Sequence, residues 1–95
     1  MSVDSDYDNY FELVRDNIAE GARRFDSTNG DRSDTWLCVM AEEQGKIARA
    51  INKLRIIPNT TAYYDERSKW KLLLKHSLIT TAAIAARMYI KELKS

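Results

Sequence analysis

The sequence predicts an all-α protein, and three features indicate this fold class. One proline and three glycines interrupt 95 residues, and runs of β-branched residues are scarce, a composition that favours helices. Apolar side chains recur three and four residues apart along three segments, which is helical spacing. Short polar stretches separate these segments. We therefore expect one domain over residues 1–95, made of a short first helix and two long antiparallel helices.

The first helix is expected over residues 6–25, with residues 1–5 disordered. Acidic residues near its start and arginines near its end suit the helix dipole. Residues 26–33 are expected to form a loop, because Asn29-Gly30 is a strong turn pair. The apolar side chains of this helix are Tyr7, Tyr10, Phe11, Val14, Ile18, Ala22 and Phe25.

The second helix is expected to begin at Ser33 or Asp34, since either can act as an N-cap. It should end at residue 55 or 56, because Pro58 biases the residue before it away from helical geometry. One anomaly marks its apolar face, where Glu43 lies among hydrophobic side chains. The other members of this face are Trp36, Met40, Ile47, Ile51 and Leu54.

The third helix is expected over residues 65–94 after a connection at 58–61, with a possible bend near Ser68. At 1.5 Å per residue it would be about 45 Å long. It is apolar around most of its circumference, and only a narrow polar strip remains. A helix of this kind is buried on most sides, and two neighbouring helices cannot cover it. We therefore expect a homo-oligomer, a helix-bundle dimer or tetramer.

Charge and composition limit the classes of partner. The net charge is +1, but residues 1–47 carry a net charge of −6 and residues 48–95 a net charge of +7. This polarity fits oppositely charged helices lying together better than nucleic-acid binding, so nucleic acid is not an expected partner. Cys38 has no cysteine partner, which fits the reducing cytoplasm. No signal region is visible, and the uncharged run 77–86 is too short to span a membrane.

A carboxylate on a core face is costly unless a cation pairs with it or a metal binds it. Mg²⁺ prefers carboxylate oxygen atoms, and the second helix offers two adjacent ones, Glu42 and Glu43. The third helix has no carboxylate before Glu92, near its far end. The alternative is that Glu43 pairs with an arginine or lysine from another helix, or with His76.

Two segments stand out, WLCVMAEEQGKIARAINKL and SLITTAAIAARMYIKEL. They resemble the signature helices of the MazG-like all-α nucleotide pyrophosphohydrolases. WLCVMAEEQGKIARAINKL is similar to the first signature helix, where a hydrophobic lead precedes EExxE. SLITTAAIAARMYIKEL is similar to the second, in which acidic or amide residues precede a run rich in alanine and valine. The resemblance covers residues 34–93, with residues 56–69 poorly matched.

The resemblance implies an Mg²⁺-dependent enzyme that splits nucleoside triphosphates into monophosphate and pyrophosphate, built as a helical dimer or tetramer. Glu42 and Glu43 match the first two metal-binding acids of EExxE, while Lys46 stands where the third acid would be. Ser77 and Thr80 stand where the second signature helix of the family would supply further ligands. A lysine in place of a carboxylate removes a ligand and adds a cation, so we expect weak or absent hydrolysis.

Three functions follow from this pattern. The first is a nucleotide-binding or regulatory protein with a degenerate active site, a type that suits a phage or mobile element. The second is an active pyrophosphohydrolase, and the third is a helical module that binds another protein. A further basic stripe at Arg67, Lys71 and Lys75 is expected to contact phosphates or, more commonly, an acidic helix of a neighbouring subunit. The expected ligand-binding residues are Lys46, Arg49, Lys53, Lys75, His76 and Thr80.

Overall fold

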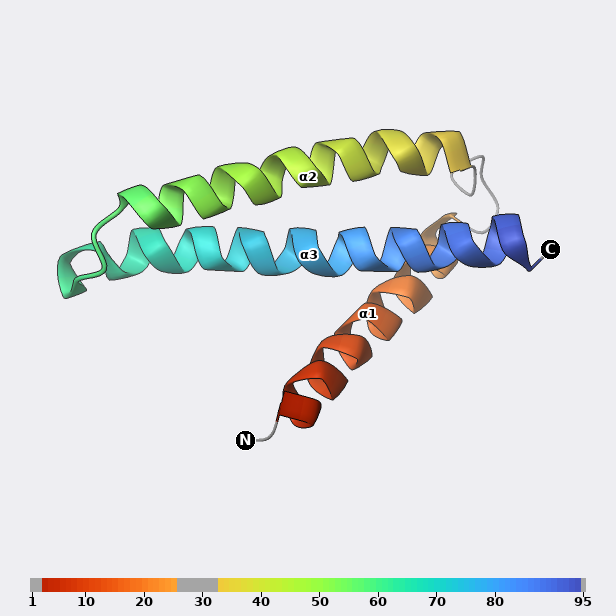
Figure 1. The fold of residues 1–95 in the computed structure, drawn as a ribbon, viewed down its shortest axis with the longest axis horizontal. Helices are drawn as coiled ribbons and strands as arrows, with labels where there is room; N and C mark the ends of the chain where they lie inside the picture. The colour runs from red at the N-terminus through yellow and green to blue at the C-terminus, as the bar shows by residue number, and fades with distance from the viewer. Residues whose placement is uncertain (1–2, 26–32, 95) are drawn as a thin grey trace.

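A computed structural model describes residues 3–25 and 33–94, and this part of the chain is helical, with no strand. Helix α1 spans Val3–Phe25 and helix α2 spans Ser33–Ile56. A short 3-10 helix, η2, covers Thr61–Tyr63 and leads into α3, which spans Tyr64–Leu93. The all-α prediction is therefore confirmed (Figure 1). The predicted loop at 26–33 lies outside the described residues except for Ser33, which begins α2.

Helix α1 begins earlier than predicted. It starts at Val3, so the expectation that residues 1–5 are disordered is wrong for residues 3–5, and residues 1–2 lie outside the described chain. Asp4 and Asp6 occupy the first turn, where the positive end of the helix dipole stabilises carboxylates. With 23 residues against 24 in α2, α1 is not a short helix.

Helices α2 and α3 form an antiparallel hairpin along the long axis of the molecule (Figure 1). Helix α2 ends at Ile56, two residues before Pro58, as predicted. Helix α3 is continuous over 30 residues through Ser68, so the helix is not broken there. The hairpin accounts for most of the 50 Å length of the protein.

The guanidinium of Arg67 fastens the closed end of this hairpin. Its Nη1 donates hydrogen bonds to the backbone oxygens of Leu54, at 2.7 Å, and Ile57, at 2.8 Å. Carbonyl groups at a helix C-terminus lack partners within the helix and favour a nearby cation. Arg67 is therefore turned toward the end of α2, although it still lines one pocket together with Lys71. The contact expected of Arg67, Lys71 and Lys75 with phosphates or with an acidic helix of a neighbouring subunit stays a prediction.

Helix α1 crosses α3 at an angle, and its N-terminal half leads away from the hairpin (Figure 1). The hydroxyl of Tyr10 donates to the backbone oxygen of Leu78 at 2.9 Å. Further along α1, Gly21 lies so close to Arg87 that a Cβ atom there would collide with the guanidinium. Arg87 in turn lies over the Trp36 ring, 5.1 Å from its centroid, and so links all three helices.

The core is small for a chain of this length. Large apolar side chains of α3 remain exposed, including Leu72, Leu78 and Tyr89 at 54%, 42% and 53%. Helices α1 and α2 therefore leave apolar surface of α3 uncovered, as its helical wheel predicts. Among the described residues, no helix combines the length and hydrophobicity needed to cross a membrane. Among the residues whose side chains the structure describes, the buried apolar ones are Trp36, Ala50, Ile57, Ile79, Ala83 and Ile84.

Candidate functional site

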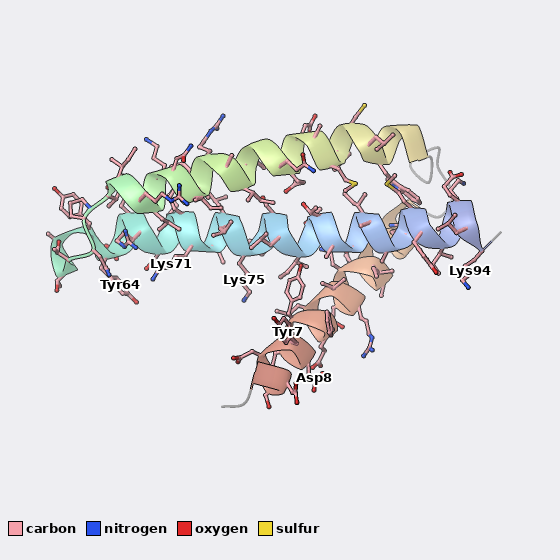
Figure 2. All side chains as sticks on the ribbon, viewed as in Figure 1. Tyr7, Asp8, Tyr64, Lys71, Lys75 and Lys94 are labelled. Carbon is pink, nitrogen blue, oxygen red and sulfur yellow. The ribbon has the colours of Figure 1, made fainter. Side chains whose placement is uncertain are left out.

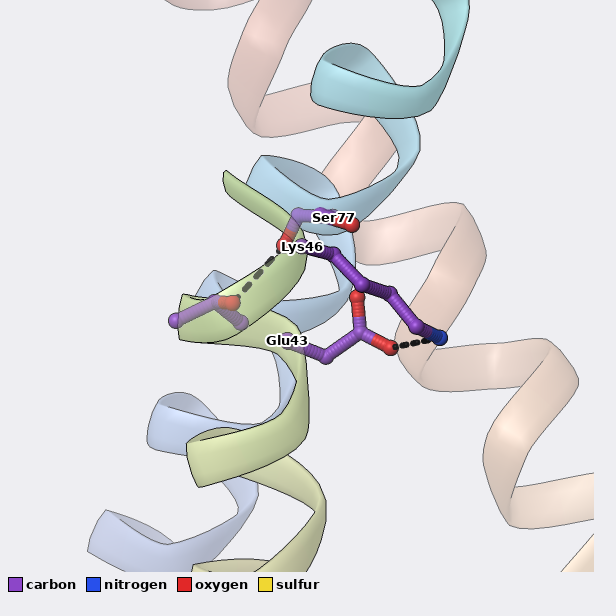
Figure 3. Close-up of polar contacts among 4 residues, drawn as sticks. Glu43, Lys46 and Ser77 are labelled. Carbon is purple, nitrogen blue, oxygen red and sulfur yellow. Dashed lines mark hydrogen bonds and ion pairs between the residues drawn. The ribbon is translucent and has the colours of Figure 1, made fainter. Parts of the chain in front are cut away.

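The anomalous glutamate is buried, and a lysine neutralises it. Glu43 faces α3 from the middle of α2, and its side chain is only 12% exposed. Lys46 Nζ lies 3.1 Å from Glu43 Oε1, one helical turn away, while its own side chain is 57% exposed (Figure 3). The aliphatic part of a lysine can lie along the helix while its ammonium group stays near water. A cation therefore holds Glu43, as predicted, but it comes from α2 itself and not from another helix.

The adjacent carboxylate does not join this site. Glu42 is exposed, whereas Glu43 is buried against α3. Consecutive residues of a helix point about 100° apart, so the two carboxylates diverge. Among the described residues, no group of three or more histidine, cysteine, aspartate or glutamate side chains is arranged to hold a metal ion.

The two hydroxyl residues expected to face the glutamates occupy different surroundings. Ser77 is 4% exposed and lies in the interface of α2 and α3 near Glu43 (Figure 3). Its backbone oxygen accepts a hydrogen bond from Thr81 Oγ1 at 2.7 Å. Thr80 instead lines a cavity that α1 also borders. Only Ser77 is therefore placed beside the glutamate, and its hydroxyl carries no charge to bind a cation.

The residues expected to bind a ligand are spread over several sides of the molecule. Lys46 is engaged with Glu43, and Lys53 Nζ lies 5.8 Å from the centroid of the Trp70 ring. Lys75 lines a groove between α1 and α3, separate from the cavity that Thr80 lines. Arg49 and His76 are exposed.

A cavity of about 320 Å³ lies between the three helices, and of its polar groups only Thr80 was among the residues expected to bind a ligand. Asn17 and Glu20 reach it from α1, Thr35 from α2, and Thr80 and Arg87 from α3. Its apolar wall consists of Trp36, Val39, Ala83 and Ile84. The sequence carries no signal for this cavity, because the cavity depends on where α1 crosses α3.

Comparison of the chain with protein-family models, curated proteins and solved structures gives no match. The likeness to MazG-like proteins therefore depends on the two sequence segments.

Proposed function

We propose that this chain is a MazG-like helical protein that acts by binding and regulation, without efficient hydrolysis. The observation that supports this proposal is the ion pair of Lys46 with the buried Glu43 carboxylate. In this proposal the lysine ammonium replaces the Mg²⁺ that the family places at this glutamate.

The chemistry of phosphoanhydride cleavage explains why this replacement matters. A metal ion activates the attacking water and neutralises the charge that develops on the phosphates. Mg²⁺ needs oxygen ligands in octahedral geometry, usually carboxylates together with substrate phosphates and water. Here one carboxylate is neutralised by Lys46, the neighbouring Glu42 diverges, and Ser77 offers a neutral hydroxyl. A lysine ammonium has no vacant coordination position at which to lower the pKa of a water molecule.

Pyrophosphate release from nucleoside triphosphates in the presence of Mg²⁺ tests the proposal. We expect the wild-type chain to release pyrophosphate at the uncatalysed rate, and Glu43→Gln and Glu42→Gln to leave this rate unchanged. Glu42→Gln is the matched control, because it makes the same change on the exposed side of α2. Mg²⁺-dependent turnover by the wild type that Glu43→Gln abolishes would instead establish an active pyrophosphohydrolase.

Nucleotide binding is the more specific form of this proposal, and the cavity between the three helices supports it. Its volume of about 320 Å³ lies at the lower end of the range for small-molecule sites. Thr80 provides a hydroxyl and Arg87 a guanidinium, which suits phosphate oxygens. Calorimetry with nucleoside triphosphates should give binding heat without turnover. Thr80→Val should weaken this binding about tenfold, whereas Ser68→Ala, on an exposed position of α3, should not.

A further inference from the structure

One face of α3 carries a regular pattern that the site described above does not use. Its side chains follow one another at strictly alternating intervals of four and three residues, the spacing of a coiled-coil seam. We call this face the α3 seam. It has basic residues at its start, apolar residues in its middle and an acidic residue at its end. Its members are Lys71, Lys75, Leu78, Ala82, Ala85, Tyr89 and Glu92.

Helices α1 and α2 leave most of the α3 seam exposed, and Ala82 at its centre is half-buried. Leu78 and Tyr89 are 42% and 53% exposed, and Ala85 is exposed as well. The side chains of Lys71 and Lys75 extend on the side of α3 away from α2 (Figure 2). The start of the seam borders the groove between α1 and α3, into which Lys71, Lys75 and Leu78 project.

The order of charges along the α3 seam makes it complementary to itself in one direction. When two copies run antiparallel and cross at Ala82, Lys71 of each copy faces Glu92 of the other. Lys75 then faces Tyr89, whose ring already has the Lys94 ammonium 6.0 Å from its centroid. The larger Leu78 faces the smaller Ala85, as close packing between helices requires. A parallel pairing would instead place each lysine against the same lysine of the other copy.

We propose that α3 pairs antiparallel with α3 of a second copy through this seam, forming a two-fold symmetric dimer. The contact closes on itself because the same surface is used by both copies. From Lys71 to Glu92 the seam is about 32 Å long at 1.5 Å per residue. Leu13 lines the groove beside the seam and adds apolar surface from α1. This inference does not depend on the proposed function, because Glu43 and the three-helix cavity lie outside the seam.

The first test is the mass of the full chain in solution, measured by light scattering and sedimentation equilibrium. The wild type should be a dimer at micromolar concentration. Ala85→Arg places a bulky cation in the apolar middle of the seam and should convert the protein to a monomer. Ala48→Arg is the matched control on an exposed position of α2 and should leave the dimer intact. A monomeric wild type, or a dimer that Ala85→Arg does not weaken, would overturn the proposal.

The second test addresses direction and register. Lys71→Glu and Glu92→Lys should each raise the dimer dissociation constant about tenfold, because each creates two like-charge contacts. The variant that carries both changes restores opposite charges at these contacts and should bring the dissociation constant back to within about threefold of wild type. A double variant as weak as the single variants, with circular dichroism showing intact helices, would exclude antiparallel pairing in this register.

Discussion

Replacing Arg67 by alanine should destabilise the protein measurably, because this one side chain fastens α3 to the end of α2. Its Nη1 makes two hydrogen bonds, of 2.7 and 2.8 Å, to Leu54 and Ile57 oxygens. Hydrogen bonds from a charged donor contribute about 1.5–3 kcal/mol each. The Arg67 Nε is buried without a hydrogen-bond partner. This unsatisfied group costs about 1–3 kcal/mol, a cost that alanine removes and that partly offsets the loss of the two hydrogen bonds. The net loss should be about 2 kcal/mol, and the midpoint of thermal unfolding should fall by about 8–16 °C.

Urea unfolding followed by circular dichroism measures this loss, with all variants at the same protein concentration because dimerisation makes stability concentration-dependent. Arg55→Ala is the matched control, since it removes the same charged group from an exposed position at the end of α2. It should cost less than about 0.5 kcal/mol. If Arg67→Ala and Arg55→Ala unfold at the same urea concentration, the two backbone hydrogen bonds do not hold the hairpin together.

Three substitutions test other contacts by the same measurement. Gly45→Ala should raise the free energy of unfolding by about 0.5–1 kcal/mol, because open space surrounds this helical position; no gain would contradict the packing described. Gly21→Ala should show no such gain, because the added methyl group displaces Arg87 from the Trp36 ring. Glu43→Leu should be neutral or stabilising by about 1–3 kcal/mol, since an apolar side chain then fills a buried charged position. A loss above about 1 kcal/mol would instead show that the ion pair of Glu43 with Lys46 stabilises the fold.

The features predicted correctly from sequence are those that local chemistry decides. Pro58 fixed the end of α2, and helical periodicity identified Glu43 as a carboxylate on a buried face. Lys46, the partner of Glu43, could be predicted from local sequence as well, because it lies one turn along the same helix. The early start of α1 also had a local signal, since Asp4 suits the first turn of a helix.

The contacts that sequence reasoning missed depend on how the helices cross. Arg67, Lys71 and Lys75 are spaced by four, but each step of four residues turns about 40° around a helix. Over two steps this rotation separates Arg67, which turns to the end of α2, from Lys75, which faces the groove beside α1. The approach of Arg87 to α1 could not be predicted either, because it requires knowing where α1 crosses α3.

The attachment of α1 has a consequence for the order of folding. Tyr10 and Leu78, which join α1 to α3, are 68 residues apart in sequence, whereas α2 and α3 meet across a short turn after Ile57. Contacts between distant residues require a larger loss of chain entropy and form later. The α2–α3 hairpin should therefore form first and α1 should dock last. Amide protons of α1 should then exchange with solvent before those of the hairpin, through local openings that leave α2 and α3 paired.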